Sequence, residues 1–452
     1  MTLLAAINWT ETGIKAGQFI FSFSVIVALH ELGHFLPAKW FGCRIEKFYL
    51  FFDPWFSLVK KKIGETEWGL GWIPFGGYVK ISGMIDESID KEAMKQPPKP
   101  YEFRSKPAWQ RLIIMVGGVV VNLVLGFFIY AMMLWHWGDE YIPANKLKYG
   151  ISVDSLGQSI GLVNGDQVLS VDGKYVEKFR SIPLNIILKH AKTMEVERNG
   201  EKKTITIPDD FASKLIHFKD ISFISYRYPF GALDTVMPEG QAYKAGLRKD
   251  DKILAYNGIS SIYYADFKTY IRENKSKPLN LRVQRGKDTL SIAATIAADG
   301  KFGLGNWYAK TDKPFEEKKI TYSFAASFPA GLQKSKETLQ NYWLQLKLIF
   351  SGRVKTSESL GSVFSIAKMY SPTWDWEALW GMTAFFSLVL ALMNILPIPA
   401  LDGGHALFTI VEMITGRRLS DKFIEYAQTA GMILLMGIMV FALGLDIFRM
   451  FK

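Results

Sequence analysis

The stretch His30-Glu31-Leu32-Gly33-His34 follows directly on an apolar run, Phe19–Leu29. Residues four apart lie on one face of a helix, so His30 and His34 can direct two imidazoles at one point. Neutral imidazoles at this spacing suit Zn²⁺, and Glu31 between them can act as general base for a water molecule. Ionisable groups are costly in a membrane segment, which favours a functional role over a chance pairing at a helix end.

The composition of the 452 residues indicates membrane spans joined to a soluble part, because 49% are hydrophobic and 21% are charged. A net charge of +11 would suit nucleic acid, but much of the Lys and Arg flanks apolar runs, which is typical of membrane topology. We therefore expect a lipid bilayer and no nucleic acid as partner. Cys43 is the only cysteine, so no intramolecular disulfide can form.

Four segments are long and apolar enough to cross a bilayer as helices of about 20 residues. They run roughly over Ala16–Pro37, Leu112–Trp135, Trp380–Leu396 and Thr429–Phe448. Basic residues are frequent in 38–111 and recur between the last two spans. The positive-inside rule places both loops in the cytoplasm and residues 138–374 outside. The His30–His34 motif then lies within or just under the membrane, at the cytoplasmic end of the first span.

The outer region contains a repeat with an offset of 85 residues. The matching pairs are Gly161 with Gly246, Asp166 with Asp251, Gly173 with Gly258, and Thr204 with Thr289. Residues 168–173 and 253–258 each predict a strand that runs into an Asp-Gly or Asn-Gly turn. Residues 204–207 and 289–292 predict further strands. Two copies at so long a period indicate tandem domains rather than a solenoid.

Both copies resemble PDZ domains of bacterial envelope proteases, in the pattern Ala-Gly-Leu-x-x-Gly-Asp-x-Ile followed by a Gly turn. The first copy has Ile160 in place of Ala, and the second has Asp250 in place of Gly. The resemblance implies that each copy captures an extended peptide or a C-terminus at a sheet edge. Two β modules that act as a size filter explain the pattern equally well.

The stretch 328–350 places aromatic and Leu residues at helical spacings with Lys residues between them. It predicts an amphipathic helix, either at the outer membrane surface or packed on the β modules.

A third metal ligand is expected, because catalytic zinc usually has three protein ligands and one water. The stretch Asn394–His405 reads Asn-Ile-Leu-Pro-Ile-Pro-Ala-Leu-Asp-Gly-Gly-His. Pro397 and Pro399 cannot continue a helix, so the third span must break there. Asp402 then lies at the depth of the first motif and is the best candidate for the third ligand. The alternative is a helix stopped by proline and followed by an Asp-Gly-Gly turn at the membrane interface. The lesser candidates are His405 and Glu412.

Together, His30–His34 and 394–403 resemble the two signatures of the site-2 protease family of intramembrane zinc metalloproteases, of the regulator of sigma-E protease type with two PDZ domains. The resemblance covers nearly the whole chain. It implies one Zn²⁺ bound by His30, His34 and Asp402, with Glu31 activating a water.

The resemblance also implies that Asn394 binds substrate or steadies an oxyanion, whereas its alternative role is an interhelical hydrogen bond. Asn122, which follows Gly117-Gly118, matches another family feature, and close helix packing with one polar contact explains it at least as well.

A substrate helix must unwind before its peptide bonds can be hydrolysed. Glu67–Lys80 is Gly-rich and predicts a β hairpin that resembles the family's membrane-reentrant β element. A free strand edge there would hold a substrate extended, although Pro74 limits which edge is available. A cytoplasmic hairpin lying on the bilayer is the alternative. The expected substrate-binding residues are Asn394, Pro397, Pro399, Phe75, Gly76, Gly77, Tyr78 and Asn122.

The sequence therefore predicts a polytopic α-helical membrane protein, with four transmembrane helices and tandem β-rich PDZ domains between the second and third spans. The expected segments are a first transmembrane helix (1–40), a cytoplasmic loop with a membrane-associated β hairpin (41–107), a second helix (108–137), two PDZ-like domains (138–221 and 222–310), an amphipathic connecting region (311–375), a third helix (376–404), and a cytoplasmic turn with a fourth helix (405–452).

The expected function is hydrolysis of peptide bonds in transmembrane segments of single-pass proteins, after another protease has removed their outer domain. The resemblance implies a bacterial inner membrane location and, as substrates, anti-sigma factors or signal-peptide remnants. The alternative is a non-proteolytic PDZ scaffold or chaperone with a vestigial metal site. Glu31 argues against it, because a structural zinc site needs no general base. A metal transporter ranks last, since the four spans lack repeated halves.

Overall fold

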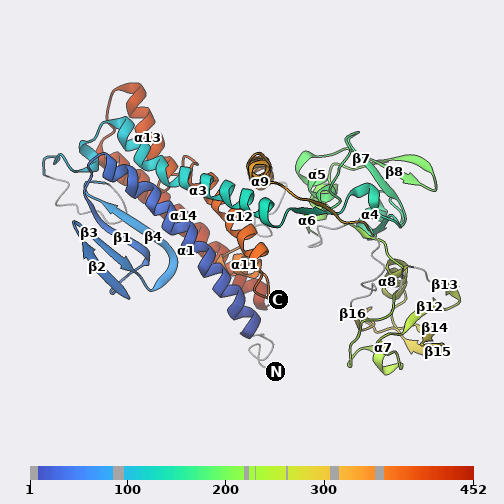
Figure 1. The fold of residues 1–452 in the computed structure, drawn as a ribbon. Coiled ribbons are helices and arrows are strands. Elements are labelled where there is room, and N and C mark those ends of the chain that lie inside the picture. The colour runs from blue at the N-terminus through green and yellow to red at the C-terminus, as the bar shows by residue number, and fades with distance from the viewer. Residues whose placement is uncertain are drawn as a thin grey trace. The chain divides into compact units, whose positions relative to one another are not determined.

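The computed structural model describes residues 9–84, 96–217, 223–229, 231–260, 263–305, 315–351 and 361–451. The chain forms two compact units, one from Met1–Gly138 with Thr321–Lys452 and one from Asp139–Ile320. The first, called here the helical unit, consists of long helices and a small sheet, and the second, the β-rich unit, consists mainly of short strands (Figure 1).

Four helices of the described residues are long and apolar enough to cross a membrane, which confirms the four predicted spans. They are α1 (Trp9–Trp40), α3 (Ala108–His136), α12 (Trp376–Asn394) and α14 (Asp421–Phe451). Three further helices in the described part of the helical unit are shorter or less apolar: α9 (Phe324–Phe350), α11 (Val363–Lys368) and α13 (Asp402–Thr415). A 3-10 turn at Phe103–Ser105 precedes α3.

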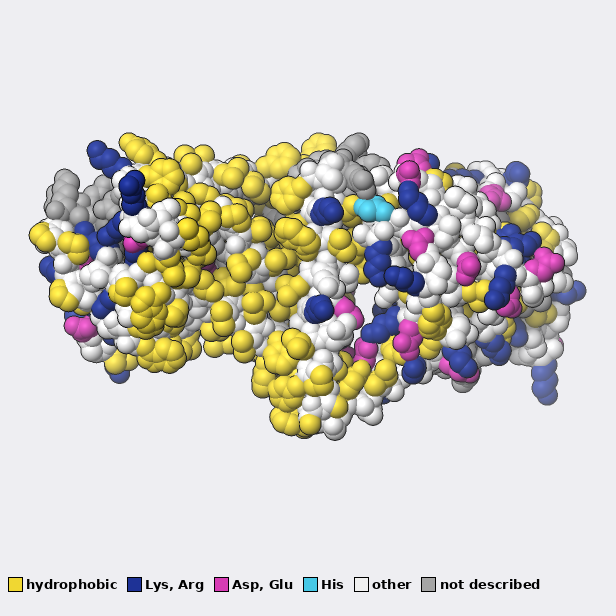
Figure 2. All heavy atoms as spheres, turned by 90° about the horizontal axis from the view of Figure 1, so that it is seen from above, with side chains coloured by type: hydrophobic (Ala, Val, Ile, Leu, Met, Phe, Trp, Pro, Cys, Tyr) yellow, Lys and Arg dark blue, Asp and Glu magenta, His cyan; other side chains and the backbone are white. Residues whose placement is uncertain are grey.

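Helix α3 is the centre of the helical unit, since α1, α9, α12 and α13 all pack against it. Ile114 and Met115 on its buried face are almost fully shielded, and Ala131 near its other end is also buried. The surface of this unit carries hydrophobic side chains over most of the visible face, as expected for a protein in a bilayer, whereas the β-rich unit shows mixed charges (Figure 2).

The predicted amphipathic helix is present as α9, but its contacts within the helical unit are with α3 and α12. Gly331 allows this approach, because a Cβ there would lie 2.7–2.9 Å from backbone and side-chain atoms of Ala131. Lys334 lies over the ring of Tyr130, 5.4 Å from its centre. The sequence showed the amphipathic pattern but not this partner.

A four-stranded sheet follows α1, with the order β2-β3-β1-β4. Its strands are β1 (Ile45–Phe52), β2 (Val59–Ile63), β3 (Thr66–Leu70) and β4 (Ile73–Ile81). Residues 67–80 therefore do not form the predicted hairpin. Strand β3 is parallel to β1 and β4 is antiparallel to it, so β1 lies between them. The chain crosses the end of β1 at Gly71, where a Cβ would overlap the backbone of Phe52.

The first repeat of the β-rich unit pairs β6 with β10 and forms a three-stranded sheet β7-β8-β9. Its elements are β6 (Ile151–Val153), α4 (Ser155–Ser159), β7 (Gln167–Val171), α5 (Ser181–Lys189), β8 (Thr193–Arg198), β9 (Glu201–Thr206), α6 (Phe211–His217) and β10 (Ile224–Tyr226). Because β10 pairs with β6, this repeat continues past the expected boundary at residue 221.

The second repeat follows a similar order of elements, with β13 added after β12 and, among the described residues, without a counterpart of α6; β11 pairs with β16, and the sheet has the order β13-β12-β14-β15. Its elements are β11 (Thr235–Val236), α7 (Gln241–Lys244), β12 (Lys252–Tyr256), β13 (Ile259–Ser260), α8 (Tyr264–Glu273), β14 (Pro278–Arg285), β15 (Asp288–Thr295) and β16 (Leu304–Gly305). Strands β5 (Asp139–Tyr141) and β17 (Lys318–Ile320) pair at the two ends of the unit.

The predicted turns after β7 and β12 are confirmed. Asp172 and Gly173 have φ values of 48° and 69°, and Asn257 and Gly258 have 44° and 78°. Two successive positive φ values are what a tight hairpin-type turn requires, which explains the Asp-Gly and Asn-Gly pairs.

Each repeat also contains a buried Asp paired with a partly exposed Arg, and this pair accounts for the shared Gly and Asp positions. Arg198 donates to both oxygens of Asp166, at 2.7 and 2.8 Å, and to the carbonyl of Gly161 at 2.8 Å. In the second repeat Arg285 donates to both oxygens of Asp251, at 2.7 and 2.8 Å, and to the corresponding carbonyl of Gly246 at 2.7 Å. We call each arrangement an Asp–Arg clamp.

Candidate metal centre

The first motif lies inside helix α1, which runs on to Trp40 through Pro37. The helix places the rings of His30 and His34 on one face, with their centroids 4.9 Å apart and their planes nearly perpendicular. Their Nε2 atoms are 3.3 Å apart. The carbonyl oxygen of Ile114 lies 2.8 Å from His34 Nδ1, so it can accept the Nδ1 proton and leave Nε2 without one.

The carboxylate of Asp402 lies beside these two imidazoles, although Asp402 is far from both histidines in the sequence. Helix α12 ends at Asn394, before Pro397, and Asp402 is the first residue of α13. Asp402 Oδ2 is 3.2 Å from His30 Nε2 and 3.4 Å from His34 Nε2. The structure thus brings together the three predicted ligands.

The spacing of these donors fits a zinc ion. Nitrogen and oxygen ligands about 2.0–2.1 Å from a tetrahedral zinc stand about 3.3 Å from one another. The three observed donor separations are 3.2, 3.3 and 3.4 Å. Among the described residues, this is the one group of His, Cys, Asp or Glu side chains close enough to share a metal. Two imidazoles and a carboxylate are also a usual donor set for catalytic zinc.

Glycines let α3 lie directly against the two imidazoles. A Cβ at Gly118 would overlap His34 Nε2 and the ring of His30, and a Cβ at Gly33 would overlap the backbone of Gly117. The fourth position of the first motif, Gly33, therefore needs a residue without a side chain. The signal in the sequence was Gly33 itself, although nothing showed which helix it would face.

Two asparagines lie at the centre. Asn394 Nδ2 is 3.3 Å from His30 Nε2 and 3.5 Å from Asp402 Oδ2, so this amide borders the ligand atoms. Asn122 is fully buried on α3, and its Nδ2 is 3.2 Å from Nδ1 of His30, on the side of the ring that faces away from Asp402.

The predicted substrate-binding residues of the sheet lie on β4, which packs against α1. A Cβ at Gly77 would stand 2.8 Å from Val27 and 3.7 Å from Cγ of Glu31, so β4 passes beside the expected general base. Gly76 has a φ of 111°, which favours glycine. The hydroxyl of Tyr78 donates to Asp53 at 2.8 Å. Phe75 belongs to β4, and its side chain is outside the described part of the structure.

The prolines lie in the segment between α12 and α13. Pro397 is exposed. The carbonyl of Pro399 lies so close to Gly431 on α14 that a Cβ at Gly431 would overlap this carbonyl. Both prolines therefore belong to the connecting segment that ends at Asp402.

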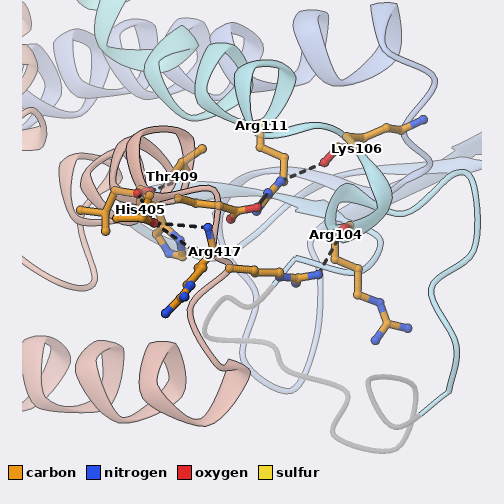
Figure 3. Close-up of polar contacts among 10 residues, drawn as sticks. Arg104, Lys106, Arg111, His405, Thr409 and Arg417 are labelled. Atoms are coloured by element: carbon orange, nitrogen blue, oxygen red, sulfur yellow. Dashed lines mark hydrogen bonds and ion pairs between the residues drawn. The ribbon is translucent and has the colours of Figure 1, made fainter.

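The two lesser ligand candidates are committed to other partners. Arg111 on α3 donates to Glu412 at 2.5 Å (Figure 3). His405 contacts Gln428 on α14. Arg418 donates at 3.4 Å to the carbonyl of Arg104, just before α3. These contacts attach α13 and the segment after it to α3 and α14, and thereby fix the helix whose first residue is Asp402.

A membrane helix that carries two imidazoles and a glutamate, next to a carboxylate that follows the broken third span, defines a membrane-embedded metallohydrolase. The model of Peptidase family M50 matches residues 18–438. The chain therefore belongs to Peptidase family M50, as the resemblance to site-2 proteases implied.

Curated relatives match over almost their full length. The Regulator of sigma-E protease RseP of Escherichia coli K12 is 28% identical, over 96% of this chain and 98% of the relative. RseP of Salmonella typhimurium 14028s is 27% identical over the same shares. A relative from Clostridium perfringens, named provisionally as a zinc metalloprotease, is 26% identical over 95% of this chain and 97% of its own length. The chain is thus a membrane metalloprotease that uses zinc, and the prediction of an enzyme is confirmed.

Proposed function

We propose that this protein hydrolyses peptide bonds in transmembrane segments of single-pass membrane proteins, with one zinc ion held by His30, His34 and Asp402. The observation that carries the proposal is the set of donor separations of 3.2–3.4 Å, which match the edges of a tetrahedral site. Zinc, when bound, polarises a carbonyl and lowers the pKa of water.

Two side chains act beside these ligands. Glu31 follows His30 on the same helix, and we assign it the role of base that takes a proton from the attacking water and returns it to the leaving amine. Asn394 Nδ2 borders His30 and Asp402 at 3.3 and 3.5 Å. Its N–H groups are placed to donate to a carbonyl oxygen that gains negative charge during attack.

Strand β4 is the element that presents the substrate in this proposal. It is an edge strand, paired only with β1 among the strands that the structure describes, and Gly77 brings it beside Glu31. A substrate segment that adds to its free edge is held extended, with peptide bonds open to attack. Phe75, Gly76, Tyr78, Pro397 and Pro399 then border that segment.

The β-rich unit acts as a filter in the same proposal. Its two repeats have a similar order of elements and the same Asp–Arg clamp, which supports the assignment of two PDZ-like domains. We place this unit on the outer side of a bacterial inner membrane and the metal centre near the cytoplasmic face. The unit admits substrates whose outer domain another protease has removed. Two relatives are named for sigma-E regulation, so anti-sigma factors are the first substrates to try, with signal-peptide remnants next.

The test is a cleavage assay in detergent with a single-span substrate that lacks its outer domain. Wild type, Glu31→Gln and wild type with a zinc chelator are compared side by side. Cleavage by wild type alone is the expected result, and equal cleavage by Glu31→Gln would remove the assigned mechanism. A second substrate that keeps a folded outer domain tests the filter, since it should be cut far more slowly.

A further inference from the structure

Both imidazoles of the first motif turn their second ring nitrogen toward helix α3. His34 Nδ1 lies 2.8 Å from the carbonyl oxygen of Ile114, and His30 Nδ1 lies 3.2 Å from the amide of Asn122. A histidine that binds a metal through Nε2 carries its proton on Nδ1 and usually donates it to an acceptor, which fixes the ring. Helix α3 supplies a partner for each of the two rings.

The partner of His34 is a carbonyl oxygen and can only accept a proton. The partner of His30 is an amide, which has an accepting oxygen at one end and a donating nitrogen at the other. Asn122 is only 1% exposed. Its Nδ2 faces His30, whereas its Oδ1 has no hydrogen-bond partner among the described residues. A buried oxygen without a partner destabilises a fold, so this orientation of the amide needs an explanation.

The orientation fits the metal-free tautomer of His30. If Nε2 carries the proton, His30 donates to Asp402 Oδ2 at 3.2 Å and its bare Nδ1 accepts from Asn122 Nδ2. Asn394 Nδ2, which lies 3.3 Å from Nε2, then has Asp402 Oδ2 as its acceptor at 3.5 Å. When Nε2 binds a metal, the proton must move to Nδ1, and two N–H groups would then face each other. Rotation of the amide by 180° removes this conflict, and it also gives the buried Oδ1 a donor.

We infer that Asn122 is a positioning residue for the metal centre, whose amide oxygen accepts the Nδ1 proton of His30 when zinc is bound and whose amide nitrogen donates to Nδ1 when it is not. The inference rests on the proposed ligand set and replaces the expected role of Asn122 in substrate binding. The Ser387 hydroxyl on α12 donates to the backbone carbonyl of Asn122 at 2.7 Å, a contact that does not involve the side-chain amide.

The chemistry explains why this position carries an amide. An ionised aspartate accepts only, and a leucine does neither, whereas an amide partners both tautomers of a ring that gains and loses its metal. Gly117 and Gly118 let α3 approach α1 closely enough for the carbonyl of Ile114 and the amide of Asn122 to reach the two imidazole rings.

The test compares Asn122→Leu, Asn122→Asp and the control Ser387→Ala in the full-length protein in detergent. Zinc affinity is measured by competition with a chromophoric chelator. Asn122→Leu should lower the affinity about 10- to 100-fold, the usual effect of losing an outer partner of a ligand. Asn122→Asp should restore it to within a few-fold, because a carboxylate accepts the Nδ1 proton. Ser387→Ala keeps the amide and should bind zinc as wild type does.

Thermal unfolding with and without zinc provides a second measurement, in case the buried aspartate prevents folding. Asn122→Leu removes both the unpartnered oxygen and the amide N–H that faces His30 Nδ1, so the metal-free midpoint should change little, whereas the upward shift on adding zinc should become smaller. A fall of both midpoints by the same amount would show a packing role and overturn the inference. Wild-type zinc affinity in Asn122→Leu, with activity lost, would return the residue to substrate binding and also overturn it.

These outcomes separate the inference from the proposed function. If wild type itself binds no zinc, or if Asp402→Ala binds it as tightly as wild type, the proposed ligand set fails. If both of those results come out as expected while Asn122→Leu behaves as wild type, only the role of Asn122 fails.

Discussion

The metal centre of the helical unit and the Asp–Arg clamps of the β-rich unit both contain buried ionisable side chains, but these side chains have different partners. In the helical unit the donor atoms of His30, His34 and Asp402 face one another with no side-chain cation among them. In the β-rich unit each buried carboxylate faces a guanidinium that donates to both of its oxygens. Donors that face one another suit a metal ion, whereas a paired carboxylate only holds the fold. Substitutions should therefore change chemistry at the metal centre and stability at the two clamps.

The largest effect is expected from Asp402→Ala. It removes a ligand, so zinc affinity should fall by more than the roughly 10- to 100-fold that follows loss of an outer partner, and cleavage should disappear. Zinc content after dialysis and the cleavage assay measure the two effects. The control is Asp375→Ala, which removes only the cap at the start of α12, where Asp375 accepts from the Ala378 N–H at 3.1 Å. Zinc retained by Asp402→Ala would contradict the ligand set.

Glu31→Gln should separate chemistry from binding inside the helical unit. Loss of a general base lowers the rate by about 10²- to 10⁴-fold, while zinc content should stay at the wild-type level because Glu31 is not a ligand. The measurement is the cleavage rate per zinc-loaded chain. Glu11→Gln, the same change near the start of the same helix, should leave the rate unaltered. A variant that loses zinc as well as activity would make Glu31 part of the binding site.

Arg198→Ala and Arg285→Ala should destabilise the two repeats and leave zinc and the catalytic centre intact. Each leaves a carboxylate that is at most 1% exposed without its guanidinium. Breaking such a pair costs roughly 3–5 kcal/mol, and the lower end applies because the arginine side chains are 23% and 42% exposed. Hydrogen exchange in the full chain measures each repeat separately. Arg282→Ala, on the exposed face of β14, is the control, and an effect as large as that of Arg285→Ala would refute the clamp.

The smallest effect concerns pH and the second repeat. Burial alone would raise the pKa of Asp251, but the hydrogen bonds from Arg285 and from the Arg248 N–H outweigh it and hold that pKa below its ordinary value of 3.8. A lowered pKa stabilises the fold above the ordinary value, and this contribution is lost as the pH falls below about 4. Hydrogen exchange of β14 should show protection falling over that range in wild type. In Asp251→Asn, protection should be weaker above pH 4 and change less below it; an identical pH profile would contradict the assignment.

The sequence was most informative where one short segment carries the pattern. Four apolar runs predicted four spans, and the i, i+4 spacing of two histidines predicted their shared face. Pro397 and Pro399 predicted the break that ends α12. The sheet was missed, because the position of β1 between β3 and β4 depends on pairing across the sheet and not on local residues. The hydrogen-bond partners of the two imidazoles were also missed. Every residue has a backbone carbonyl, so no sequence pattern marks that of Ile114, and Asn122 lies 92 positions from His30.

The order of the metal ligands along the chain has a consequence for synthesis. His34 and Asp402 are separated by 368 positions (402 − 34), and the whole β-rich unit lies between them. At about 5–20 residues per second, the ribosome needs roughly 20 to 70 s to pass from one to the other. Throughout that time the nascent chain holds two imidazoles without their carboxylate. A nascent chain therefore cannot cut anything, its own unfolded spans included, until Asp402 has been synthesised.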